Sequence, residues 1–360
     1  MAAVELDEVG VRFGPLVALE GVTLAIRPGE VFCLLGPSGS GKSTLLRVMA
    51  GVEQPTTGTV QLDGVLVAGP RTFVEPERRR VGMVFQDHAL FPHLTIAGNV
   101  GFGLQGRGRG ERETRVGALL DRVGLARYRA SYPHMLSGGE RQRAALVRAL
   151  APEPRVLLLD EPFSSLDSRL REQVRVEALD LVRETGTTTV VVTHDAGEAV
   201  RIADRIGLLR EGRLVQCGTP DELYARPASV FAARFFGDVN ELGGTCRGGS
   251  VETPLGSFAS PHLAESSAAR VCIRPQHVRV SAVSTGIRAR VLAANRMGEH
   301  GRLLVEVPGL ATPISLGAAD RSRLSVGDTI HLDLDAAHAI VVPDDGPGGW
   351  PPGLPNGAPS

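Results

Sequence analysis

The chain has 360 residues, of which 42% are hydrophobic and 22% are charged, and its net charge is −1 at pH 7. These values exclude a wholly disordered chain and a nucleic-acid binder that depends on general positive charge. No apolar run reaches the length of a membrane-spanning helix, and the acidic N-terminus does not resemble a secretory signal.

The first two thirds of the chain alternate predicted strands and helices. Residues 1–27 are predicted to form two strands, each with alternating apolar residues. Buried strands are then predicted at Val31–Leu35, Val81–Phe85, Val156–Leu159, Thr188–Val192 and Ile206–Leu209. Strands that alternate with helices predict an α/β domain with a largely parallel sheet, over residues 1–237. Residues 96–152 contain several helical patterns instead, which predicts an inserted helical subdomain at about 90–154.

The pattern changes after about Asp238. The pairs Gly243-Gly244 and Gly248-Gly249 predict a linker over 238–250. Short alternating strands with frequent turns follow, and they predict a small all-β domain over 251–343. The tail, residues 344–360, is rich in Pro and Gly, which predicts disorder.

A glycine-rich loop after the strand Val31–Leu35 matches the pattern G-x-x-x-x-G-K-[ST]. It consists of Gly36, Pro37, Ser38, Gly39, Ser40, Gly41, Lys42, Ser43 and Thr44. Such a loop lets backbone N–H groups surround phosphate oxygens at the start of a helix. Lys42 is the one lysine among 39 basic residues, although arginine can replace lysine at most surface positions. The loop therefore predicts a nucleotide phosphate site, with Lys42 on the phosphates and Ser43 on Mg²⁺.

Two acidic residues end the buried strand Val156–Leu159. Asp160 suits the binding of Mg²⁺, and Glu161 suits activation of the water that attacks a γ-phosphate. Together with the phosphate loop, the pair predicts an NTP-hydrolysing enzyme.

Four further features narrow this class. They are Gln86 after a strand, the helix-opening segment Leu136–Arg143, the segment Ser164–Asp167, and His194 after another strand. In this order and spacing, the set resembles the ATP-binding-cassette (ABC) ATPases, and the resemblance covers residues 1–237. The segment 36–44 resembles their Walker A motif, residues 160–161 the end of Walker B, and residues 136–140 the signature motif.

The resemblance implies a P-loop NTPase fold with a RecA-like core, a helical subdomain and an OB-like C-terminal domain. It implies catalytic roles for Glu161, His194 and Gln86. It implies Mg²⁺ binding by Ser43, Gln86 and Asp160. ATP binding is implied for residues 36–44 and for Phe13, Ser137, Gly138, Gly139, Glu140 and Asp167, with Phe13 stacked on adenine. The family commonly has Gln where this chain has Glu140, whose carboxylate we expect to point toward ribose or solvent.

The resemblance also implies partners. The working unit would be a head-to-tail homodimer that holds two ATP molecules at composite sites, and residues 86–94 would contact an integral-membrane permease. A single head with a C-terminal β domain resembles the ATPase subunit of an importer. That implies a peripheral location on the cytoplasmic face of the inner membrane and a periplasmic or lipid-anchored substrate-binding protein, with no nucleic acid.

The sequence does not decide which cargo such an importer would carry. Residues 73–78, 84–95 and 273–275 are most similar to ferric-iron and polyamine importers, and we expect ferric iron. Sulfate or another small solute is an alternative, and a soluble ATP-dependent regulatory switch is an alternative of a different class. The arginine-rich segments indicate solvated surface, and His88, His93 and His134 do not have the spacing of metal ligands.

Overall fold

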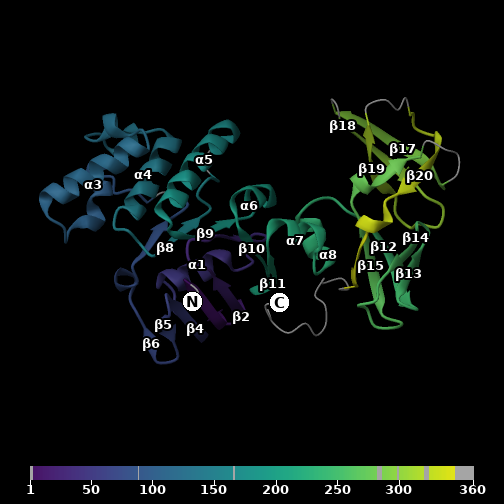
Figure 1. Ribbon diagram of the computed structural model, residues 1–360, viewed down its shortest axis with the longest axis horizontal. Helices are drawn as coiled ribbons and strands as arrows, with labels where there is room; N and C mark the ends of the chain where they lie inside the picture. The colour runs from purple at the N-terminus through teal and green to yellow at the C-terminus, as the bar shows by residue number, and fades with distance from the viewer. Residues whose placement is uncertain are drawn as a thin grey trace. The chain divides into compact units, whose positions relative to one another are not determined.

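Figure 1 shows a computed structural model of the chain, which describes residues 3–87, 89–164, 167–281, 286–297, 300–319 and 324–344. The chain forms two compact units that divide between Pro220 and Asp221. No helix in the described ranges is both long enough and apolar enough to cross a bilayer.

The first unit contains two sheets. One is antiparallel, with the order β2-β1-β4-β5-β6. Its strands are β1 (Val4–Phe13), β2 (Leu16–Ile26), β4 (Thr57–Leu62), β5 (Val65–Gly69) and β6 (Thr72–Phe73). The other has the order β11-β10-β3-β9-β8-β7 and is parallel except for the edge strand β11. Its strands are β3 (Val31–Leu35), β7 (Val81–Val84), β8 (Val156–Asp160), β9 (Thr188–Thr193), β10 (Arg205–Arg210) and β11 (Arg213–Gly218).

The central strands β3, β8 and β9 are buried along their whole length, because helices or the other sheet cover both faces. The covering helices are α1 (Lys42–Ala50), α5 (Ser168–Thr185) and α6 (Ala196–Ile202). On one face α1 packs among residues of both sheets in a single apolar cluster. Since the three strands are parallel, their carboxyl ends lie at one edge of the sheet, which brings the loops that follow them together.

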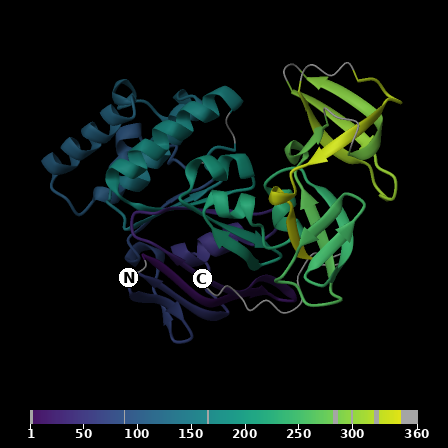
Figure 2. The same ribbon diagram turned by 45° about the vertical axis from the view of Figure 1, so that its right-hand side comes forward.

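Helices fill the predicted helical stretch. They are α2 (Ile96–Val100), α3 (Arg109–Arg122) and α4 (Gly138–Leu150), with 3₁₀ turns at Phe102–Leu104, Ala126–Tyr128 and Pro133–Met135. These helices share a second apolar cluster with α5 and the other face of the sheet. In both views α3, α4 and α5 lie side by side (Figures 1 and 2).

The second unit is built mainly from two antiparallel sheets around one apolar core. The first sheet contains β12 (Asn240–Arg247), β13 (Ser250–Thr253), β14 (Gly256–Ala259), β15 (Ala268–Ile273) and β21 (Ile340–Pro343). The second contains β16 (Val278–Val280), β17 (Ile287–Met297), β18 (His300–Glu306), β19 (Ile314–Ala319) and β20 (Thr329–Leu334). Figure 2 shows the two sheets at opposite ends of this unit.

The linker predicted over 238–250 is wrong, because β12 and the start of β13 occupy it. Gly248 and Gly249, with φ of 57° and 74°, form the two-residue turn between these paired strands. At Gly244, a Cβ atom would lie 2.4 Å from the side chain of Val251, so the strand needs glycine there. The glycine pairs therefore mark a hairpin and a close contact between strands.

The division at Pro220 also precedes the predicted domain end at residue 237. The helix α8 (Val230–Phe235) packs against β15, and α7 (Pro220–Ala225) contacts the residues that follow β15. Arg274 is 2% exposed, stacks on the Tyr224 ring at 3.8 Å and donates a hydrogen bond of 3.0 Å to the Tyr224 carbonyl. Beyond Asp344, the predicted disordered tail lies outside the described residues.

Candidate active site

The phosphate loop connects β3 to α1, as predicted. Gly36 lies so close to β10 that a Cβ atom would be 2.2 Å from the Leu209 carbonyl oxygen. Gly41 precedes α1 with a φ of 100°, and it provides no side chain to cap the helix. The N–H groups of the first helical turn therefore lack a side-chain acceptor, which leaves them suited to phosphate oxygens.

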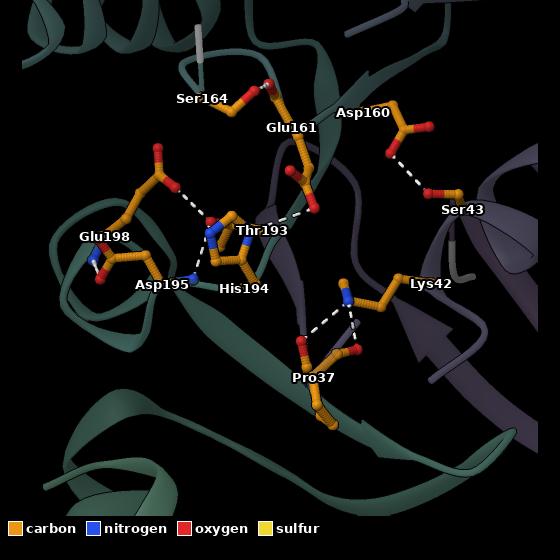
Figure 3. A network of polar contacts seen from close by, with 11 residues as sticks. Pro37, Lys42, Ser43, Asp160, Glu161, Ser164, Thr193, His194, Asp195 and Glu198 are labelled. Carbon is orange, nitrogen blue, oxygen red and sulfur yellow. Dashed lines mark hydrogen bonds and ion pairs between the residues drawn. The ribbon is translucent and has the colours of Figure 1, made fainter. Parts of the chain in front are cut away.

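Lys42 is 5% exposed and folds back on its own loop. Its ammonium donates to the carbonyl oxygens of Gly36 and Pro37, both at 2.8 Å. Burial lowers the pKa of Lys42, and the nearby carboxylates of Glu161 and Asp160 act in the opposite direction. The ammonium thus lies within the loop that its motif assigns to phosphate (Figure 3).

Ser43 and Asp160 meet at the carboxyl edge of the sheet. The Ser43 hydroxyl donates to Oδ1 of Asp160 at 2.9 Å. Burial raises the pKa of Asp160, which is 8% exposed. Val84 pairs with Leu159, so the exposed Gln86 follows at the same edge. A hydroxyl, a carboxylate and an amide oxygen at one edge are the ligand types that Mg²⁺ prefers, so these residues fit the ion.

Glu161 and His194 form the pair next to this group. His194 Nδ1 lies 3.2 Å from Oε1 of Glu161, whose carboxylate lies between His194 and Lys42 in Figure 3. Glu161 has a φ of 44°, an uncommon value for a residue with a side chain, and its N–H donates to Val192 in β9. The strained backbone turns this carboxylate toward the loop of Lys42.

The signature segment forms the start of α4. Ser137 is the N-cap, and its hydroxyl lies 2.8 Å from Oε2 of Glu140, which also accepts the Ser137 N–H at 2.8 Å. Glu140 does not point into solvent, which was one of the two expected directions: its side chain is 14% exposed and completes a capping box with Ser137. Burial opposes ionisation, but hydrogen bonds from Tyr128 and Ser137 and the charge of Arg127 together lower the pKa of Glu140 to about 2.

Two other predicted ATP-binding residues, Phe13 and Asp167, are exposed to solvent. Phe13 ends β1 with 45% of its surface exposed, next to Leu16 at 63%, and together they offer an apolar surface for a flat base. Asp167 is exposed directly before α5. Ser165 and Leu166 of the same segment lie outside the described residues, as does His88.

The sequence did not reveal the hydrogen-bonded residues on either side of His194, which are Thr193 and Asp195 with their partner Glu198. Thr193 donates to the buried carboxylate of Glu198, and its hydroxyl accepts the Asp195 N–H at 3.1 Å. Asp195 caps α6 by accepting the Glu198 N–H at 3.1 Å. Asp followed three residues later by Glu is a signal for a helix start that could have revealed this network.

Asn99 was missed as well. It is fully buried, and it makes four hydrogen bonds to the backbone of Phe91, Leu94 and Thr95. Asn99 thereby fixes the backbone of the segment 91–95 at the start of the helical subdomain.

Comparisons with known proteins identify two domains in this chain. The model of the ABC transporter family matches residues 19–164, and that of the TOBE domain matches residues 271–342. An Fe(3+) ions import ATP-binding protein of Streptomyces coelicolor is 43% identical, over 95% of this chain and 97% of the relative. A sulfate/thiosulfate import ATP-binding protein of Chromobacterium violaceum is 42% identical, over 93% of each chain.

Solved structures resemble the first unit. A dimeric ATP-binding cassette in a post-hydrolysis state, bound to ADP and Pi, is 35% identical with a TM-score of 0.53. The match covers 60% of this chain and 98% of that one. The cbiO1 protein of Clostridium perfringens, part of an ABC transporter complex, is 30% identical with a TM-score of 0.58, over 62% of this chain and 91% of that one.

The phosphate loop, the acid pair and His194 at one sheet edge define an ABC-type ATPase. The chain belongs to the family of ABC import ATP-binding proteins, with an OB-like TOBE domain after the ATPase fold.

Proposed function

We propose that this chain is the ATPase subunit that powers a ferric-iron importer. The proposal rests on the positions of the nucleotide motifs. Lys42, Glu161 and His194 lie together at the carboxyl edge of the sheet. Ser137 instead caps α4, which packs in the apolar cluster of the helical stretch, and its hydroxyl bonds to Glu140 of the same helix. One chain therefore offers a phosphate site and, elsewhere, a separate helix N-terminus suited to anions. Two chains arranged head to tail supply both parts to each of two ATP molecules.

At each composite site the residues have different roles in ATP binding and hydrolysis. The loop N–H groups and Lys42 hold the phosphates. Ser43, Asp160 and Gln86 would hold Mg²⁺, which when bound neutralises charge on the β- and γ-phosphates. Glu161 accepts a proton from the water that attacks the γ-phosphorus, and the bond to the leaving ADP breaks. His194, in contact with Glu161, orients that carboxylate.

The exposed surface near Gln86 suits a membrane partner. Phe85 and Phe102 are 37% and 44% exposed, and Asn99 fixes the backbone at Phe91, Leu94 and Thr95 by hydrogen bonds. A rigid segment next to the ATP site can transmit the opening and closing of the dimer to a permease. With a substrate-binding protein outside, such an assembly would place this subunit at the cytoplasmic face of the membrane.

Ferric iron is proposed as cargo because relatives named as Fe(3+) importers match nearly the whole chain. The sulfate/thiosulfate relative makes sulfate the second candidate. In a deletion strain, uptake of radioactive ferric iron should fall and should be restored by the intact gene but not by Glu161→Gln. Loss of sulfate uptake with normal iron uptake would select the second candidate. Normal uptake of both, with no permease recovered with the protein, would favour a soluble regulatory switch.

A further inference from the structure

Two histidines and an aspartate gather at one edge of the second unit. His277 ends the 3₁₀ turn Pro275–His277, and His338 ends the turn Ala336–His338, which Asp335 precedes. These turns adjoin paired strands, because Val278 of β16 lies opposite Leu334 of β20. The Asp335 N–H also donates to the His277 carbonyl oxygen at 3.0 Å. The backbone therefore holds the three side chains together.

The donor atoms of the three side chains are close to one another. Asp335 Oδ2 lies 2.8 Å from His338 Nδ1, and the rings of His277 and His338 stack with centroids 4.3 Å apart. One donor atom from each of the three residues lies within 4.8 Å of the others. The side chains of Asp335 and His338 are 40% and 58% exposed, so water can complete the coordination of an ion.

We propose that His277, Asp335 and His338 bind a divalent transition-metal ion such as Zn²⁺. Two imidazoles and one carboxylate form a donor set typical of Zn²⁺ and Fe²⁺, whereas Mg²⁺ prefers oxygen ligands alone. This site lies in a different unit from the ATP site, and it does not depend on the proposed cargo.

Binding requires one ring to turn. A metal ion lies in the plane of each imidazole that ligates it, and the two ring planes are within 5° of parallel. His338 is the more exposed ring, so it rotates, and its hydrogen bond to Asp335 is replaced by bonds from both side chains to the ion. Arg274 and Arg279 add positive charge near His277, which weakens the binding of a cation, and Asp335 acts in the opposite direction.

A bound ion would join the turn before β16 to the turn before β21. Since β16 belongs to one sheet and β21 to the other, the ion would link the two sheets of this unit. Binding to the folded state alone then raises the melting temperature of this unit.

The test is a Zn²⁺ titration of the tag-free, full-length protein in competition with a chromophoric chelator. The wild type should bind one more equivalent than His338→Ala. The affinity of that equivalent should fall at least about tenfold in His277→Ala and in Asp335→Asn. His331→Ala, a substitution in β20 outside the cluster, should behave as the wild type does, and excess Mg²⁺ should not compete.

A melting curve provides the second readout. Zn²⁺ should raise the melting temperature of the wild type and of His331→Ala, but not that of His338→Ala, whose exposed side chain can be removed without disturbing the core. Equal Zn²⁺ binding by the wild type and His338→Ala would overturn the proposal. So would Zn²⁺ binding with no ligand-dependent shift in melting. Zn²⁺ held at the ATP site would be common to all variants and would cancel in the comparison.

Discussion

Replacing Glu140 with Gln tests the role of the unusual signature residue. Gln can complete the same capping box, so the start of α4 should keep its structure while one negative charge is lost. The substitution also turns the charge-assisted hydrogen bonds from Tyr128 and Ser137 into neutral ones and removes the charge contact with Arg127, 3.6 Å away, so the melting temperature should fall while the protein stays folded. The substitution therefore isolates the effect of the charge on the closing of the dimer.

The distances give the expected size of this effect. Ser137 Oγ lies 2.8 Å from the Glu140 carboxylate. That hydroxyl has one proton, which it donates to Glu140, so it must turn away from the carboxylate before it can donate to a γ-phosphate oxygen. With the hydroxyl oxygen unmoved, a phosphate oxygen ~2.8 Å from it would lie within ~5.6 Å of the carboxylate. There, two unit charges repel by about 0.7 kcal/mol in water and by about 3 kcal/mol at an effective dielectric of 20. Removing the charge should strengthen ATP-driven dimerisation about 3-fold to 150-fold per site, with Arg127 favouring the lower values.

The assay is sedimentation of the Glu161→Gln protein, with and without Glu140→Gln, over a range of ATP concentrations. The double variant should dimerise at lower protein concentration. Glu140→Ala is the structural control, because it removes both the charge and the capping box. Unchanged or weaker dimerisation by a folded Glu140→Gln protein would refute the electrostatic reasoning.

Three further predictions concern the ATP site and its support. Lys42→Ala should weaken ATP binding at least about tenfold, because a charge-assisted contact with the phosphates is lost; normal binding of a fluorescent ATP analogue would contradict the Walker A assignment. Glu161→Gln should keep ATP binding and slow hydrolysis at least about 100-fold, and turnover at the wild-type rate would exclude Glu161 as the base. Burial raises the pKa of Glu198 in the folded protein. The wild type therefore loses stability as the pH rises from the pKa of the unfolded chain toward that of the folded protein. The free energy of unfolding of Glu198→Gln minus that of the wild type should therefore be larger, meaning a relatively more stable variant, at pH 7 than at pH 5, and a denaturant titration at the two pH values that showed the opposite trend would contradict this.

Much of the ATP site could be predicted because its residues follow strand ends in local motifs. The segment from Gly36 to Thr44 specifies its own turn and helix start. Asp160 and His194 then follow from the parallel order of β3, β9 and β8, since the carboxyl ends of neighbouring parallel strands meet. No pattern specified the positive φ of Glu161, because that conformation depends on the surrounding sheet.

The capping role of Glu140 was not predicted, for a different reason. Ser137 followed three residues later by Glu140 is itself a capping-box pattern, and we interpreted the residue only through its place in the signature motif. The glycine pairs at 243–249 were misinterpreted because glycine marks turns and close strand contacts as well as linkers. The cluster joins His277 to Asp335 and His338, which are far from it in sequence, so only the strand pairing reveals it.

The composite site is tested most directly by mixing two inactive chains. Ser137→Arg places a guanidinium where the signature should meet the partner's γ-phosphate, and Lys42→Ala disables the phosphate loop. In a mixed dimer one site carries both lesions and the other carries neither. We predict that mixing restores part of the ATPase activity in proportion to the heterodimer formed. No ATPase activity above that of the separate chains, with heterodimers shown to form, would contradict a site shared between two chains.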